Sequence, residues 1–172
     1  MRLLFEIDTK DYNLNGKIVI RPSVRSIIIK DGLVALVYSE KYNYYKFPGG
    51  GIEANETHEE ALIRETLEES GLKVIKKSIK PYGIVHRIQK GVRGEDVFIQ
   101  DNFYYFCDVE NSVYNQNLDP YESDEKFTLY FMDPVDAIHA NRQNDHGPKQ
   151  KIMILREARV LEMLIQEGYF NK

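Results

Sequence analysis

Residues 50–72 constrain the fold more than any other part of the sequence, because they specify where a helix begins and ends. Glu60 follows Thr57 by three residues, and this spacing predicts a capping box at the start of a helix. Gly71 stands just after the last expected helical residue, where a left-handed backbone favours glycine. The sequence therefore predicts a glycine-rich loop that leads into a well-defined helix.

Three glutamates in this expected helix form an acidic cluster. Glu65, Glu68 and Glu69 lie three and four residues apart, so their side chains share one face. Like charges at this spacing destabilise an isolated helix by ~0.2–0.5 kcal/mol per pair. Carboxylate oxygens suit Mg²⁺ or Mn²⁺ better than zinc, so the cluster indicates a site for a hard divalent cation. On this view, Glu69→Gln relieves repulsion and should slightly stabilise the metal-free protein.

The spacing within residues 50–72 resembles the signature of the Nudix hydrolases. That signature reads Gly, five residues, Glu, seven residues, Arg-Glu, an aliphatic residue, any residue, Glu-Glu, any residue, Gly and an aliphatic residue. The matching residues are Gly50, Glu56, Arg64, Glu65, Glu68, Glu69, Gly71 and Leu72. Thr66, in the first aliphatic slot, is the one departure. A solvated acidic helix after a glycine-rich turn is the alternative, and it explains neither the spacing nor Arg64.

The resemblance implies an α/β fold, the α/β/α sandwich of Nudix domains with a mixed β-sheet. All 172 residues are expected to form one domain, with a core at residues 23–166 and an N-terminal extension at residues 1–22. Asn15 and Gly16 predict a hairpin within that extension. Residues 148–167 have the apolar spacing of a long C-terminal helix.

Alternating apolar residues and turn residues predict the other elements. Asp31 and Gly32 are a second hairpin signal. The expected strands are residues 3–8, 17–30 with a break near Pro22, 33–39, 78–89, 97–109 and 129–132. A short helix is expected at residues 134–141, directly after Asp133. Residues 119–125 are expected to form an acidic loop.

The resemblance also implies roles for individual residues. The expected metal ligands are Glu65, Glu69 and Glu68, the backbone carbonyl of Gly49, and one acidic residue from a later loop. The expected catalytic residues are Glu56, Arg64, Glu65 and Glu68. Glu56 would either support a ligand or act as the general base. Arg64 would hold a glutamate in place rather than contact the substrate.

The acidic loop offers two candidates for the additional ligand. Counting back from Phe131, which occupies a slot where relatives often have Trp, favours Glu125 over Glu122. A solvated acidic loop with no ligand is an equally weighted alternative. The register depends on the length of the loop, so Glu122 stays open as the alternative ligand.

Three residues are candidates for substrate binding. Arg25 is expected to face a substrate phosphate, with a surface arginine as the alternative. Tyr45 precedes the glycine loop and could stack on a base, although aromatic residues in strands more often serve packing. Gly50 would bring the backbone close to a bound phosphate.

The resemblance narrows the substrate without identifying it. Relatives that hydrolyse ADP-ribose tend to have Pro where this chain has Arg87, and the Tyr typical of dinucleoside polyphosphate hydrolases is absent after it. The upstream motif of coenzyme A pyrophosphatases is also absent. Nucleoside triphosphates, oxidised nucleotides and nucleotide-sugars remain as substrate classes. A Nudix-fold sensor that binds a nucleotide without cutting it is the alternative function, although such proteins usually lose acidic positions that are intact here.

Composition restricts the partners and the compartment. The net charge of −4 argues against non-specific attraction to nucleic acid or to a membrane surface. The single cysteine, Cys107, cannot form an intrachain disulfide, and the first residues contain no apolar h-region, so a cytoplasmic protein is expected. A small nucleotide-type molecule is the expected partner, and a homodimer stays open.

Overall fold

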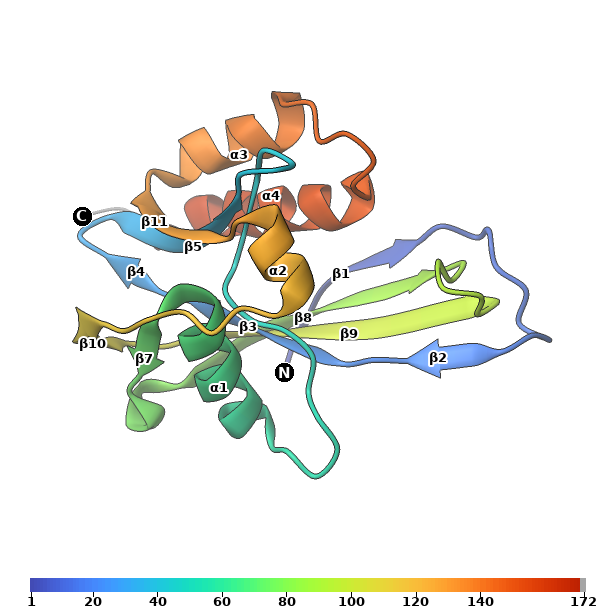
Figure 1. The fold of residues 1–172 in the computed structure, drawn as a ribbon, viewed down its shortest axis with the longest axis horizontal. Coiled ribbons are helices and arrows are strands. Elements are labelled where there is room, and N and C mark those ends of the chain that lie inside the picture. Colours follow the sequence, from blue (N-terminus) through green and yellow to red (C-terminus); the bar gives the residue numbers. More distant parts are fainter. Residues whose placement is uncertain (171–172) are drawn as a thin grey trace.

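The computed structural model describes residues 1–170, in which helices cover both sides of the strands (Figure 1). Helix α1 (His58–Ser70) packs on one side, and helices α3 (Pro134–Gln143) and α4 (Lys151–Gln166) pack together on the other. A short helix, α2 (Pro120–Glu125), lies between them in Figure 1. The predicted α/β/α sandwich is therefore confirmed.

The larger sheet has five strands and mixes parallel and antiparallel pairs. Its members are β1 (Leu3–Asp8), β2 (Ile18–Ile20), β3 (Ser23–Ile27), β8 (Lys80–Gln89) and β9 (Val97–Phe106). Strands β8 and β9 form a long antiparallel hairpin, β1 runs parallel to β8, and both β2 and β3 run parallel to β9.

The predicted N-terminal hairpin is wrong. Strands β1 and β2 do not pair with each other, because each lies on a different edge of the β8–β9 hairpin (Figure 1). Asn15 and Gly16 lie near the end of the connection between these separated strands. The local sequence indicates the turn residues. It does not indicate the partners of the two strands, because these partners are about 80 positions away.

The second sheet has four strands. Its members are β4 (Ile29–Lys30), β5 (Leu33–Ser39), β6 (Tyr44–Lys46) and β11 (Thr128–Met132). Asp31 and Gly32 join β4 to β5 with φ angles of 52° and 78°, so the predicted hairpin turn is confirmed. The sequence did not predict β6, nor the separate pair formed by β7 (Leu72–Val74) and β10 (Val109–Val113).

Helix α1 begins and ends as predicted. The Thr57 side chain accepts from the backbone N–H of Glu60, the Glu60 side chain accepts in return, and Gly71 is left-handed with φ 74°. Thr66, the departure from the aliphatic pattern, is fully buried and hydrogen-bonds the Ser26 hydroxyl of β3. A hydroxyl partner on the sheet explains why a polar residue is accommodated in that slot.

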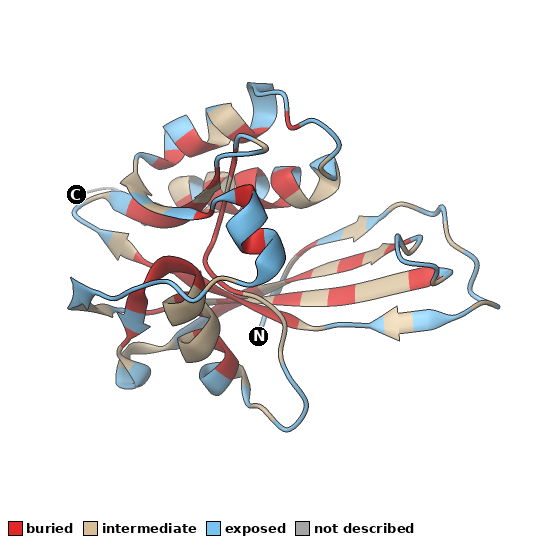
Figure 2. Ribbon diagram, in the orientation of Figure 1, coloured by how far each residue is buried: buried red, intermediate tan, exposed pale blue. Residues whose placement is uncertain are grey.

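Buried residues lie on both the strands and the helices (Figure 2), and they form separate clusters toward α1 and toward α4. On the α1 side, Ala61 and Leu62 pack with Val24 and against Phe103. On the α4 side, the buried residues include Phe5, Val85, Tyr104, Leu161 and Leu164. Helix α4 begins at Lys151 rather than near Pro148, and strand β9 ends at Phe106 rather than at residue 109. The expected acidic loop contains α2. No helix within residues 1–170 is both long enough and apolar enough to cross a bilayer.

Candidate active site

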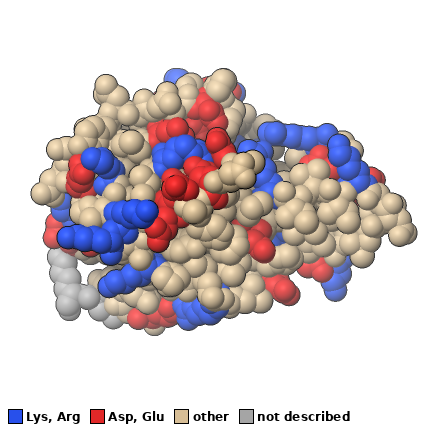
Figure 3. Space-filling model, turned by 90° about the horizontal axis from the view of Figure 1, so that it is seen from below, with Lys and Arg blue, Asp and Glu red and all other residues tan. Residues whose placement is uncertain are grey.

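Arg64 joins the acidic residues of α1 and its preceding loop into one network. Its Nε and Nη2 donate to the two oxygens of Glu56 at 2.7 and 2.8 Å, and its Nη1 donates to Glu65 at 2.7 Å and to Glu68 at 3.2 Å. The hydrogen bonds between Arg64 and Glu56 lower the pKa of Glu56 and raise the pKa of Arg64. On the face of the molecule seen from below, several Lys and Arg residues lie next to Asp and Glu residues (Figure 3).

The three carboxylates of α1 lie at different depths. The side chain of Glu69 is 1% exposed, that of Glu65 is 14% exposed and that of Glu68 is 34% exposed. Burial raises the pKa of Glu65 and of Glu69, and nearby cations oppose the rise in both. Glu68 is therefore the carboxylate most open to solvent and substrate.

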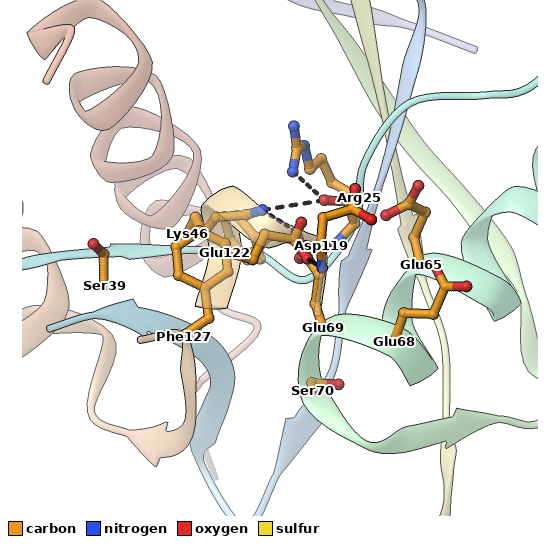
Figure 4. Close-up of polar contacts among 12 residues, drawn as sticks. Arg25, Ser39, Lys46, Glu65, Glu68, Glu69, Ser70, Asp119, Glu122 and Phe127 are labelled. Carbon is orange, nitrogen blue, oxygen red and sulfur yellow. Dashed lines mark hydrogen bonds and ion pairs between the residues drawn. The ribbon is translucent and has the colours of Figure 1, made fainter. Parts of the chain in front are cut away.

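Glu69 contacts the glycine loop and a lysine (Figure 4). Its Oε2 accepts from the backbone N–H of Gly49 at 2.9 Å, and its Oε1 forms an ion pair with Lys46 Nζ. The carbonyl oxygen of Gly49 accepts from Lys46 Nζ at 3.2 Å and from Arg25 Nη1 at 2.5 Å. Lys46 was not among the residues predicted for the site. It lies two residues after Tyr44, so the two side chains share one face of β6.

The glycine loop makes this close arrangement possible. Gly49 has φ 142°, and a Cβ there would collide with the carbonyl oxygen of Val24 on β3. A Cβ on Gly50 would collide with the Glu65 carboxylate. Glycine at these two positions therefore lets the backbone approach both the larger sheet and the acidic face of α1.

The donor atoms at this site fit a hard divalent cation in their chemistry. Glu65, Glu68, Glu69 and the Gly49 carbonyl supply oxygen atoms only. Within residues 1–170, however, no three Asp, Glu, His or Cys side chains converge as a ready metal cluster. Arg64 holds Glu65 and Glu68, and Lys46 holds Glu69, so a metal ion would have to exchange with cations of the protein itself.

The preference for Glu125 as the additional ligand is not supported by its contacts. Glu125 is buried, and it accepts from the Ser39 hydroxyl at 2.8 Å and the Tyr44 hydroxyl at 2.9 Å and pairs with Lys149. Its charge is thus satisfied by Ser39, Tyr44 and Lys149. The count back from Phe131 expects a loop, whereas residues 120–125 are helical, and Glu122 and Glu125, three residues apart in that helix, are both buried.

Glu122 is the acidic residue of α2 that faces the candidate site (Figure 4). Its charge contributes to the raised pKa of Glu69, which places the two carboxylates within electrostatic range. Glu122 accepts from the backbone N–H of Asp119 at 2.9 Å and from the Tyr121 hydroxyl at 2.8 Å. The backbone N–H of Asn117 donates to the carbonyl oxygen of Glu68 at 2.8 Å, so the segment before α2 is attached to α1.

A cluster of buried arginines continues the site along the larger sheet. Arg25 of β3, Arg87 of β8 and Arg156 of α4 are each at most 7% exposed. Arg156 pairs with Glu157, whereas the Nε atoms of Arg25 and Arg87 are buried without a hydrogen-bond partner in the described chain. Burial, together with the charges of Arg156 and Arg25, lowers the pKa of Arg87 to about 9. Arginines outnumber carboxylates here, so the cluster can receive an anionic group.

Tyr45 lies apart from these groups. Its ring packs against Tyr38 and Tyr130, with centroids 4.7 and 6.2 Å away. Successive side chains of a strand alternate between faces, so Tyr45 points to the opposite side of β6 from Lys46. The structure thus brings Arg25 and Gly50 to the carboxylates but does not bring Tyr45 there.

The chain is similar to known proteins in both its sequence and its fold. A family model described as NUDIX domain matches residues 19–154. A Bacillus subtilis (strain 168) protein, YtkD, whose name provisionally describes it as an 8-oxo-dGTP diphosphatase, is 44% identical over 66 residues. That match covers 38% of this chain and 37% of the relative, so it spans little more than a third of either protein.

Solved structures share the fold at low sequence identity. A NUDIX hydrolase from Nitrosomonas europaea aligns with a TM-score of 0.56 and 18% identity, over 83% of this chain and 90% of that one. A MutT structure from a study of the Aliivibrio salmonicida and Vibrio cholerae proteins aligns with a TM-score of 0.55 and 16% identity, over 87% and 99% of the two chains.

Proposed function

The chain belongs to the NUDIX domain family, and on that premise we propose that it hydrolyses a diphosphate bond in a nucleoside diphosphate derivative, using Mg²⁺ or Mn²⁺. The supporting observation is the placement of Glu65 and Glu69 against the glycine loop, where Gly49 and Gly50 bring backbone atoms close to both carboxylates. A divalent cation bound there would neutralise phosphate oxygens and make a coordinated water acidic. Glu65, Glu68, Glu69 and the Gly49 carbonyl would hold it.

The contacts favour separate roles for Arg64, Glu56 and Glu68 in the proposed reaction. Arg64 acts as a positioning residue, because its guanidinium is fully engaged with the glutamates around it. Both oxygens of Glu56 accept from Arg64, so Glu56 supports Arg64 rather than accepting a proton from water. Glu68 makes one long hydrogen bond and is the most exposed carboxylate of α1, which favours it as the proton acceptor.

We further propose that the substrate is a nucleoside triphosphate or its oxidised form. Arg25 donates to the glycine loop, and Arg87 lies within electrostatic range of Arg25, so both provide buried positive charge, which suits a substrate with several phosphate groups better than a nucleotide-sugar. The name of the Bacillus subtilis relative agrees with this class, over the 66 residues that match. Glu122 is proposed as the additional acidic residue of the site in place of Glu125.

Arg87→Met tests the phosphate-binding role of the arginine cluster. We expect KM for the substrate to rise about tenfold or more, since a hydrogen bond to a charged group contributes about 1.5–3 kcal/mol. The free energy of unfolding should stay the same or increase, because a buried charge without a carboxylate partner is removed. Steady-state kinetics and chemical denaturation measure the two effects. Arg142→Met, which breaks an exposed pair with Glu162, is the control for loss of one arginine.

A substrate panel tests the proposed reaction directly. Nucleoside triphosphates, 8-oxo-dGTP and nucleotide-sugars would be incubated with Mg²⁺ or Mn²⁺, and product phosphates would be identified by chromatography. We expect turnover on at least one triphosphate and none after removal of divalent cations with EDTA.

The alternative function, a sensor that binds a nucleotide without cutting it, predicts a different result for the same panel. It requires nucleotide binding with no turnover on any compound at any metal concentration. That result would remove the hydrolase proposal while leaving the fold and the binding residues in place.

A further inference from the structure

Lys46 contacts oxygen atoms that the resemblance to Nudix hydrolases predicts as metal ligands. Its ammonium contacts Glu69 Oε1 and lies 3.2 Å from the carbonyl oxygen of Gly49 (Figure 4). These are two of the oxygen atoms expected to bind the divalent cation. Other acidic groups of α1 are held by Arg64, which contacts Glu65 and Glu68 but neither of these two atoms.

The surroundings of Lys46 hold its ammonium group in this position. The side chain is 9% exposed, and its ammonium lies 5.0 Å from the centre of the Phe127 ring. Lys46 ends strand β6, and the next residue, Phe47, is fully buried and donates its backbone N–H to Glu157 at 2.9 Å. The backbone that carries the ammonium is therefore fixed close to the glycine loop, and the charge cannot move far from the site.

A divalent cation bound to these two oxygen atoms would be repelled by the ammonium of Lys46 and would compete with it for their lone pairs, and the Gly49 carbonyl also accepts from Arg25. A divalent cation that binds Glu69 and the Gly49 carbonyl has to displace the ammonium of Lys46, and the displaced charge stays nearby because its strand is anchored. An ammonium bound to both oxygens thus lowers the affinity of the site for a metal in the absence of substrate. The same ion pair holds the buried Glu69 charge, which would otherwise lack a partner on that oxygen.

We propose that Lys46 is a tethered cation that competes with the metal for Glu69 and Gly49 and sets the metal affinity of the substrate-free protein. The inference rests on the proposed function only in taking these two groups as metal ligands. It adds a determinant of metal affinity that lies outside residues 50–72.

Mn²⁺ binding to the substrate-free protein provides the test. Isothermal titration calorimetry with MnCl₂ would compare the wild type with Lys46→Met, which has similar length and no charge. Competition predicts that Lys46→Met binds Mn²⁺ about tenfold more tightly, within the usual range of coupling between two ligands. A merely structural role predicts unchanged or weaker binding, because loss of a structural contact does not improve a site.

Two matched variants separate competition from a general change in charge. Lys149→Met removes the same charge from another buried glutamate, Glu125, and should leave Mn²⁺ affinity within about twofold of the wild type. Lys46→Arg keeps a cation at the site and should retain the weak binding. If Lys46→Met binds no more tightly than the wild type, or if Lys149→Met gains as much, the proposal is overturned.

Folding of the variant is part of the same test. Lys46→Met leaves Glu69 without its cation, so we expect its metal-free form to melt at a lower temperature and Mn²⁺ to raise that temperature more than it does in the wild type. If Lys46→Met is unfolded without metal, recovery of its circular dichroism on adding MnCl₂ supports the proposal, and no recovery overturns it. Failure of the wild type and all variants to bind Mn²⁺ would instead remove the metal-dependent function itself.

Discussion

Glu69→Gln is expected to reduce kcat/KM by at least about 100-fold, because changes to residues that only support metal ligands already cost 10–100-fold. The substitution keeps the shape of the side chain and removes the charge that both Lys46 and a metal would use. Activity on the best substrate of the panel, measured at saturating Mg²⁺, gives the loss. Activity within threefold of the wild type would contradict the assignment of Glu69 as a ligand.

For the stability of Glu69→Gln, the sequence alone and the structure predict changes of opposite sign. Repulsion among glutamates predicted a slight stabilisation, but Glu69 is buried and paired with Lys46. We therefore expect Glu69→Gln to be less stable, by less than the ~3–5 kcal/mol of a fully broken buried pair, since the amide oxygen can still accept from Lys46. Chemical denaturation of the metal-free protein measures the change. Glu59→Gln, at an exposed position of α1, should change neither activity nor stability appreciably.

Glu125→Gln is expected to lower stability, whereas Glu122→Gln is expected to lower kcat. Glu125 is held by Ser39, Tyr44 and Lys149, so its substitution should destabilise the protein by up to ~3–5 kcal/mol while kcat of the folded fraction changes little. Glu122 faces the carboxylates of α1, so Glu122→Gln should lower kcat with a smaller effect on substrate affinity.

Thermal denaturation and steady-state kinetics on both variants decide between the two residues. A loss of kcat in Glu125→Gln, with Glu122→Gln active, would restore the register inferred from the sequence. Full activity in both would mean that α1 and the glycine loop form the site without an acidic residue of α2.

Local signals in the sequence determined helix α1 and one turn. The capping box at Thr57 and Glu60, the left-handed Gly71 and the turn at Asp31 and Gly32 each depend on residues a few positions apart. The carboxylate cluster follows from the same local geometry, because helical periodicity places its members on one face. These features were therefore predictable without knowledge of the rest of the chain.

Contacts between distant segments decided the rest, for reasons of pairing and register. The two N-terminal strands pair with β8 and β9 rather than with each other, and no local pattern selects among possible strand partners. Helix α2 stands where a loop was expected, and Glu125 at its end contacts Ser39, Tyr44 and Lys149. Lys46 contacts Glu69 across 23 positions, and Arg87 of β8 comes within electrostatic range of Arg25 of β3 and Arg156 of α4, with β9 between the two strands. The sequence by itself determined the carboxylates of α1 and the Arg64 that lies among them. Only the tertiary structure brought Lys46, Arg25 and Glu122 to these groups.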